Sequence, residues 1–156
     1  MQTQLEQLAL FQQTFKCDYN TSPTLLPKET CELRARLMQE ELDEYTVACL
    51  DGDLVEILDS LVDQLYILLG TAHSHGVAHL LPESFQRVHD NNMSKVINDS
   101  DTLKETVEQF KSKGVEVRTE NALTGGSLVI RKADGKILKP HNFKAVDLSD
   151  LIFGKE

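Results

Sequence analysis

Residues 40–63 read EELDEYTVACLDGDLVEILDSLVD and specify two helices joined by a tight turn. On both sides of the DGD triplet at residues 51–53, apolar side chains recur every three or four positions, as in a helix that buries one face. The triplet combines aspartate with glycine, a pairing that stops a helix and reverses the chain. We therefore predict two adjacent antiparallel helices, one from Lys28 to about Leu50 and one from about Asp53 to His75.

Other segments with helical spacing flank this hairpin. Residues 3–16 carry Leu5, Leu8, Phe11 and Phe15 on one face, and two prolines mark residues 20–27 as the loop that follows. A fourth helix is predicted after Leu81, with Pro82 at its first position. The histidines at 73 and 75 diverge around the helix end, so we interpret them as a frayed, solvated terminus.

The character of the chain changes near residue 100. Residues 102–105 have a capping-box pattern and predict a short helix that ends at Gly114. Two segments rich in β-branched residues follow at 115–118 and 127–132, and Asp134-Gly135 is a hairpin signal. The sequence thus predicts a mainly α protein. Residues 1–99 form an antiparallel helical bundle, and residues 100–156 add a helix and a small antiparallel β-hairpin appendage packed on the same single domain.

Charge and hydropathy exclude several classes of protein. The 156-residue chain carries 25 acidic and 16 basic side chains, a net charge of −9, which disfavours binding to nucleic-acid backbones or anionic membranes. Its apolar runs are far shorter than the roughly 20 residues of a membrane span. The amino terminus lacks a signal-peptide pattern, and three cysteines without CxxC spacing suit reduced thiols, so we expect a cytoplasmic protein.

Acidic side chains form a strip on each hairpin helix. Helical spacing places Glu41 and Glu44, with Glu40, on one face of the first helix, and Glu56, Asp59 and Asp63 on one face of the second. The second strip lies only about 100° from the apolar stripe, so both strips can face one cleft between the helices. Carboxylates that converge in this way favour Mg²⁺, with Mn²⁺ as a second possibility.

Two other uses of these carboxylates compete with a magnesium site. Acidic residues on helices often form nothing more than a solvated face, but two strips on consecutive helices, each bordering an apolar stripe, favour the metal. A di-iron site in a helical bundle needs Glu-x-x-His motifs. No glutamate in the sequence is followed by histidine three residues later.

The ordered motifs resemble those of a known superfamily. Glu41-Leu-Asp-Glu44, followed by Glu56-Ile-Leu-Asp59, is similar to the ExxE…ExxD signature of the all-α nucleoside triphosphate pyrophosphohydrolases, which include MazG, the phosphoribosyl-ATP pyrophosphohydrolases and the dimeric dUTPases. Residues 59–70, DSLVDQLYILLG, resemble the second metal helix of the phosphoribosyl-ATP pyrophosphohydrolase-like, often phage-borne branch. Residues 88–95 and 134–140 also resemble segments of that branch.

The resemblance implies an enzyme that cleaves a nucleoside triphosphate, or a phosphoribosyl-ATP-like nucleotide, between its α- and β-phosphates and releases a monophosphate and pyrophosphate. It implies that magnesium is held by four carboxylates: Glu41, Glu44, Glu56 and Asp59. The metal would neutralise charge on the phosphates and lower the pKa of an attacking water. Glu40 is then the candidate to orient or deprotonate that water, and Asp63 is either a further ligand or a group that supports one.

Candidate substrate-binding residues lie on the third and fourth helices and in the tail. Asn92 and Lys95 are one helical turn apart and can reach a phosphate, although Lys95 can also be a surface lysine. Lys136 and Lys139 either close over the nucleotide or decorate a solvated strand. Tyr66 either stacks on a base or fills the core.

The resemblance also implies a homodimer or homotetramer, because long amphipathic helices in so small a chain gain from burying faces across a symmetry axis. The segment from about 100 to 133 departs from the minimal family pattern. Two other functions remain open, namely a non-catalytic helical module that binds a nucleotide or partner through the same acidic hairpin, and a simple cation buffer. The sequence does not specify base or sugar preference.

Overall fold

The computed structural model describes residues 1–154, which form two compact units, residues 1–83 and 84 onward. The division falls between Glu83 and Ser84. That residues 1–99 and 100–156 belong to one domain stays a prediction. Within the described residues, six α-helices and one two-stranded antiparallel sheet confirm the mainly α class with a small β appendage. No helix among residues 1–154 combines the length and apolar character of a membrane span.

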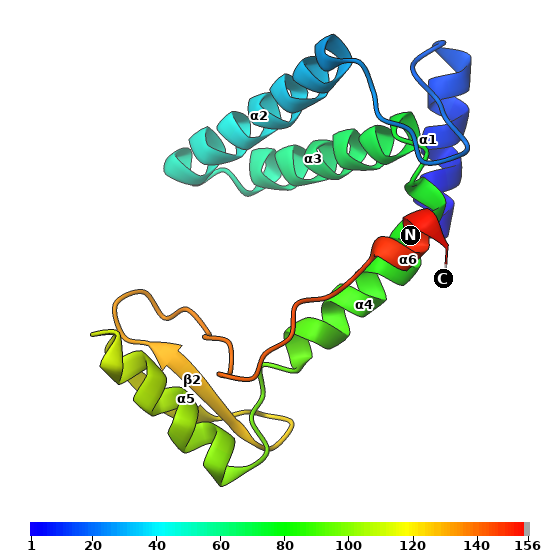
Figure 1. The fold of residues 1–156 in the computed structure, drawn as a ribbon. Helices are drawn as coiled ribbons and strands as arrows, with labels where there is room; N and C mark the ends of the chain where they lie inside the picture. Colours follow the sequence, from blue (N-terminus) through cyan, green and yellow to red (C-terminus); the bar gives the residue numbers. More distant parts are fainter. Residues whose placement is uncertain (155–156) are drawn as a thin grey trace. The chain divides into compact units, whose positions relative to one another are not determined.

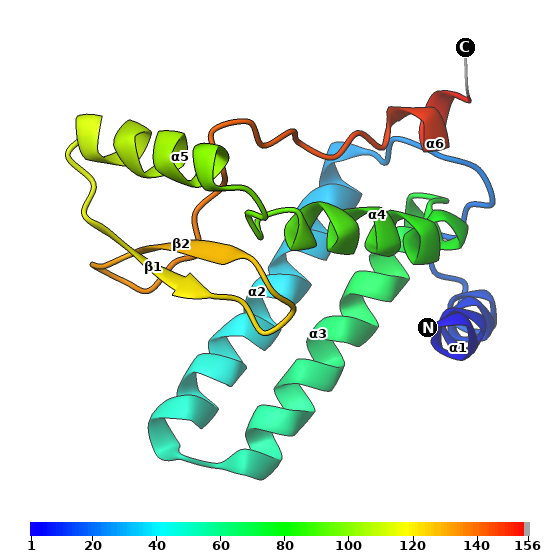
Figure 2. The same cartoon turned by 90° about the horizontal axis from the view of Figure 1, so that it is seen from below.

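The first unit is built on the predicted hairpin. Helix α2 (Lys28–Asp51) and helix α3 (Leu54–Ser74) run antiparallel, as Figures 1 and 2 show. Gly52 takes the left-handed backbone conformation at φ 70°, which residues with a Cβ atom rarely adopt. Helix α2 therefore ends at this glycine. Asp53 then caps α3, because its Oδ1 accepts hydrogen bonds from the backbone N–H groups of Val55 (2.9 Å) and Glu56 (3.2 Å). The DGD triplet therefore makes the turn by two separate mechanisms.

Helix α1 (Gln2–Thr14) packs against the carboxyl-terminal end of α3. Its Leu5 and Leu8 join Leu69, Ala72 and Ala78 in the core of the first unit. The loop between α1 and α2 is tied to the same end, since the N–H of Asn20 donates to the carbonyl of His73 (3.0 Å) and the N–H of Thr24 to that of His75 (2.8 Å). These contacts hold α1 and the loop that follows it against the carboxyl-terminal end of α3.

The interpretation of His73 as a solvated residue is wrong. The side chain is 7% exposed, its Nε2 lies 2.8 Å from the carbonyl oxygen of Leu5, and its ring stacks on Tyr19. The amino-terminal helix and the following loop cover this end of α3, and neither lies near position 73 in sequence. Helical periodicity within one segment could not show that cover.

The second unit contains most of helix α4 (Leu81–Met93), together with helix α5 (Ser100–Ser112), strands β1 (Val117–Asn121) and β2 (Ser127–Arg131), and the short helix α6 (Ser149–Phe153). The strands pair antiparallel with Thr119 opposite Val129. Helix α5 packs on the sheet (Figure 2). The core of this unit holds Ile97, Val129 and Leu138. The predicted second hairpin appears as a single bridge between Ile130 and Ile137.

One detail of α5 differs from prediction. The residue that caps the helix is Asp99, whose Oδ1 accepts from the N–H of Thr102 at 2.7 Å. The helix thus begins before the capping-box pattern would place it, and Thr102 lies inside its first turn. Aspartate and threonine are both good capping residues, so the local pattern offered two alternative starts.

Candidate functional site

The carboxylate of Glu41 lies at the centre of the acidic face of the α2–α3 hairpin. The backbone carbonyl of Glu41 accepts a hydrogen bond from the side chain of Gln64 at 3.3 Å, which aligns this part of α2 with the middle of α3. Burial raises the pKa of Glu41, and so do its acidic neighbours, which in order of decreasing effect are Glu44, Asp63, Glu40 and Asp59. The structure thus groups five of the six predicted acidic site residues electrostatically.

This acidic group has no compensating base within the part of the chain that the structure describes. Among residues 1–154, no lysine, arginine or histidine forms an ion pair with any of the six predicted acids. Oε2 of Glu41 is shielded from solvent and lacks a hydrogen-bond partner in the described part of the chain. A buried carboxylate oxygen without a partner is energetically unfavourable, so a cation or donor from outside the chain would stabilise it.

Glu56 belongs to an adjoining pocket nearer the hairpin turn. This pocket of about 560 Å³ is lined by Glu44 and Glu56 together with Asp43, Asp51 and Asp53. Glu44 also raises the pKa of Glu41, so it links this pocket to the acidic group around Glu41. Of the three predicted ligands besides Glu41, Glu56 is the one that is not among the acids that raise the pKa of Glu41.

The carboxylates are not closed into a ready ligand shell. Within the described residues, no three His, Cys, Asp or Glu side chains lie close enough to hold one metal ion. Five of the six acids are exposed on the hairpin surface: Glu40, Glu44, Glu56, Asp59 and Asp63. Binding of a metal by these groups therefore requires rotation of exposed side chains, a substrate phosphate or a second subunit to complete the shell.

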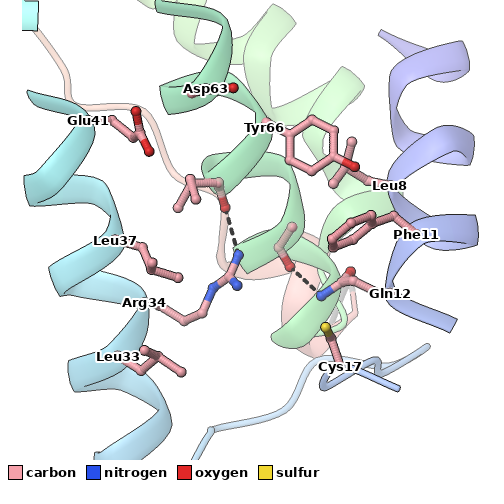
Figure 3. A pocket seen from close by; sticks show the side chains of 12 residues that line it. Leu8, Phe11, Gln12, Cys17, Leu33, Arg34, Leu37, Glu41, Asp63 and Tyr66 are labelled. Atoms are coloured by element: carbon pink, nitrogen blue, oxygen red, sulfur yellow. Dashed lines mark hydrogen bonds between the residues drawn. The ribbon is translucent and has the colours of Figure 1, made fainter. Parts of the chain in front are cut away.

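A pocket of about 480 Å³ opens beside Glu41 among α1, α2 and α3. Figure 3 shows Glu41 and Asp63 at one end of it, and Arg34, Gln12 and Cys17 at the other. Its walls are mainly apolar and include Leu8, Phe11, Leu33, Leu37, Tyr66 and Ile67. The ring of Tyr66 meets that of Phe11 edge to face at 5.4 Å, so the predicted substrate-binding residue Tyr66 does lie in a pocket.

Two polar residues at the inner end of this pocket were missed by the sequence reasoning. Arg34 donates to Oγ1 of Thr71 and to the carbonyl of Ile67, both at 2.9 Å, and burial lowers its pKa. Gln12 is 2% exposed. Both had a signal in the sequence: Arg34 precedes Glu41 by seven residues and so shares its helix face, and Gln12 interrupts the apolar stripe of α1.

The remaining predicted substrate contacts belong to the second unit. Nζ of Lys95 donates to Oδ1 of Asn92 at 2.7 Å, and both residues line a pocket of about 700 Å³ with parts of the β-hairpin. Lys95 lies in a turn just after α4 rather than on the helix. Lys136 and Lys139 do not line that pocket, and Nζ of Lys139 lies 4.8 Å from the ring centre of Phe143.

Comparison with known proteins assigns the sequence to a family. The family model described as phosphoribosyl-ATP pyrophosphohydrolase matches residues 8–92, which is more than half of the chain and contains α2, α3 and the whole acidic face. The chain is also 30% identical over 146 residues to "Uncharacterized protein L479" of Acanthamoeba polyphaga mimivirus. That alignment covers 88% of this chain and 57% of the viral protein, so this chain spans a little over half the length of that relative. The extent of the family match shows that the chain belongs to the phosphoribosyl-ATP pyrophosphohydrolase family.

Proposed function

We propose that the protein is a magnesium-dependent nucleotide pyrophosphohydrolase, which cleaves a nucleoside triphosphate or phosphoribosyl-ATP-like nucleotide between the α- and β-phosphates. The observation that carries this proposal is the shielded, unpartnered oxygen of Glu41, in a carboxylate whose pKa is raised by burial and by four acidic neighbours. The charged form of a carboxylate in such surroundings is stabilised most strongly by a bound divalent cation. The adjacent pocket supplies space for the organic part of a nucleotide.

The donor set fits a hard divalent cation. All the candidate ligands, Glu41, Glu44, Glu56 and Asp59, are carboxylates, the ligand type that magnesium and manganese prefer, and magnesium commonly shares its shell with substrate phosphates. When bound, the metal would neutralise charge on the phosphates and lower the pKa of a water. Since the carboxylates on the chain are not closed into a shell, phosphate oxygens would fill part of it.

Glu40 and Asp63 have separate proposed roles. Glu40 adjoins Glu41 on an exposed part of α2, where its carboxylate can accept a proton from a water that attacks the α-phosphorus. Asp63 lines the pocket with Glu41 and would bind the metal directly or orient a ligand that does. Tyr66 would contact the nucleoside, and Asn92 and Lys95 would hold a phosphate through their amide and ammonium groups.

Assembly into a homodimer or homotetramer is part of the proposal. Seven large apolar residues of α3 are between 46% and 78% exposed: Leu54, Val55, Leu58, Leu61, Val62, Leu65 and Leu68. An apolar surface of this extent on a single helix marks an interaction site. A second copy would bury it and bring further side chains to the acidic face. We also propose that the protein is cytoplasmic, because its three cysteines are free thiols.

Pyrophosphate release tests the proposal. The full chain is incubated with Mg²⁺ and a panel of ribonucleoside triphosphates, deoxynucleoside triphosphates and phosphoribosyl-ATP, and both products are identified. We expect a monophosphate and pyrophosphate in equal amounts from at least one substrate, and no turnover with a chelator present. Metal-dependent nucleotide binding without turnover of any substrate would instead favour the non-catalytic binding module.

A further inference from the structure

We infer that the pocket among α1, α2 and α3 binds the nucleobase, and that Oε1 of Gln12 accepts a hydrogen bond from a nitrogen-bound hydrogen of that base. The inference rests on the proposed function for the identity of the ligand. It names Gln12 as a residue that recognises the base, and it places the base at the inner end of the pocket. Neither statement follows from the carboxylates.

The orientation of the Gln12 amide is determined by its surroundings. Nε2 donates to the carbonyl of Asp18 (2.8 Å), to the carbonyl of Gly70 (3.0 Å) and lies 3.0 Å from Oγ of Ser74. Two of these partners are pure acceptors, so the nitrogen must face them and the oxygen must face the other way. Figure 3 shows the nitrogen on the bond to the backbone of α3 and the oxygen on the side of Phe11.

Oε1 of Gln12 is consequently an acceptor without a donor. It is shielded from solvent and has no hydrogen-bond partner within the described residues, although the residue lines the pocket. Leaving a buried amide oxygen unpaired is unfavourable, and native proteins satisfy nearly all such groups. A donor from a ligand in the pocket would satisfy it.

The rest of the lining suits a flat, partly polar ring. Phe11 and Tyr66 present aromatic surface, and Leu33 and Leu37 line the pocket from α2. Arg34 uses two of its five N–H donors on Thr71 and Ile67, which leaves donors for an acceptor on the ligand. An acceptor and a donor at the inner end of an apolar pocket match the alternating edge of a nucleobase.

The two ends of the pocket also match the polarity of a nucleotide. Glu41 and Asp63 lie at the end opposite Gln12 and Arg34 (Figure 3). A base at the inner end therefore directs its sugar and phosphates toward the carboxylates, where the metal is proposed. The volume of about 480 Å³ lies in the range of about 300–1,000 Å³ that is usual for small-molecule sites.

The test uses nucleosides, which carry the base but no phosphate, so its outcome does not depend on hydrolysis. Adenosine, cytidine, guanosine and uridine are titrated into the metal-free full chain and followed by NMR. The tightest binder is then compared with analogues in which each N–H group is removed or methylated in turn. We expect one such change to weaken binding about tenfold or more, because it leaves Oε1 of Gln12 unpaired.

Two variants locate the effect. Gln12→Met keeps the size of the side chain but removes the amide oxygen. In this variant the N–H-bearing nucleoside and its analogue should bind with about equal affinity. General damage to the fold would instead lower both affinities by the same factor and keep their ratio. Leu33→Trp fills the pocket without touching the Gln12 bonds and should abolish nucleoside binding. Arg36→Trp, on the same helix but outside the pocket lining, is the matched control and should bind as the unmodified chain does.

Three results would overturn the inference. One is the absence of nucleoside binding up to about 10 mM while triphosphates are still hydrolysed, which would separate its failure from that of the proposed function. Another is equal affinity for the N–H-bearing nucleoside and every analogue. The third is a preference that persists in Gln12→Met or binding that persists in Leu33→Trp.

Discussion

The acidic group around Glu41 in the first unit and several acids of the second unit are used in opposite ways. In the second unit, Asp134 accepts two hydrogen bonds from Arg131, at 2.8 Å and 2.5 Å, which with the N–H of Lys136 lower its pKa to about 2. Asp99 and Asp147 accept backbone N–H bonds that lower their pKa values, and Asp150 pairs with Arg87. In the first unit, the pKa of Glu41 is raised and no base pairs with its group among the described residues.

This contrast separates structural acids from acids that await a ligand. A carboxylate that stabilises its own fold is given donors, and its pKa falls as a result. A carboxylate kept among other acids destabilises the free chain, and such an arrangement is typical of sites that bind cations or perform proton transfer. The first unit also carries the exposed apolar stripe of α3, whose seven large residues are between 46% and 78% exposed.

The largest effect is expected from neutralising Glu41. Because Glu41→Gln removes a proposed metal ligand with almost no change in shape, we expect pyrophosphate release to fall by at least about 100-fold. The measurement is the initial rate with Mg²⁺ and the best substrate of the panel. Asp134→Asn, in the second unit, should leave the rate unchanged. An unaltered rate of pyrophosphate release in Glu41→Gln would contradict the proposal that the protein is a pyrophosphohydrolase.

A charge in the exposed apolar stripe of α3 should break the assembly. Leu58 is 64% exposed, and a glutamate there would be buried without a partner in an oligomer, so we expect Leu58→Glu to weaken association about 100-fold or more. Light scattering after size-exclusion chromatography measures the mass in solution. Leu25→Glu changes a residue that is 96% exposed in the loop before α2 and serves as the control. An oligomer of Leu58→Glu as stable as that of the unmodified chain would exclude this surface as the interface.

Divalent metal should stabilise the chain through Glu41. At a Mg²⁺ concentration of about 100 times the Kd, linkage gives about 2.7 kcal/mol, or a rise in Tm of about 5–10 °C for a chain of this size. Differential scanning calorimetry with and without Mg²⁺ should show this rise in the unmodified chain and little of it in Glu41→Gln. Equal rises in both proteins would place the metal elsewhere.

Without metal, the sign of the Glu41 effect on stability reverses. A carboxyl group with a raised pKa stabilises the fold fully below its unfolded pKa of 4.5, and this contribution is lost as the pH rises through the folded pKa. We therefore expect metal-free Glu41→Gln to melt above the unmodified chain at neutral pH, with the gap closing on acidification toward pH 4.5. A lower Tm for the variant at neutral pH would contradict the repulsion among these acids.

The smallest effect is expected from Asp134, which is exposed. Its pKa is lowered to about 2, so its contribution to stability is present above its unfolded pKa of 3.8 and is lost as the pH falls through about 2. Asp134→Asn should lower the Tm slightly at neutral pH, and the difference should disappear below about pH 2. A Tm difference that is independent of pH would mean that Asp134 acts through something other than its charge.

Local sequence patterns predicted the helices well, because each helix carries its own periodicity and punctuation. The turn at residues 51–53 was predicted from three residues, and the structure shows a left-handed glycine followed by a capping aspartate. The acidic residues were selected by their spacing, and four of them do raise the pKa of Glu41. Their metal and catalytic roles stay predictions.

Interactions between distant segments could not be predicted in this way. His73 is buried because α1 and its loop cover it, and Gln12 becomes a pocket residue because Asp18, Gly70 and Ser74 hold its amide in place. The boundary between the units also depends on how segments pack in space rather than on composition. Each of these features joins residues that are far apart in the chain or come from several elements.

The sequence by itself determined the hairpin and the two acidic strips, because a helix repeats every 3.6 residues and a strip of one residue type is visible in the linear order. The resemblance of the ordered motifs then indicated the family, which the family match over residues 8–92 confirmed. Only the tertiary structure decided which carboxylate oxygen and which glutamine oxygen are shielded and left without a partner among residues 1–154. Burial and hydrogen-bond satisfaction depend on what other segments bring to the same place, and no local repeat encodes that.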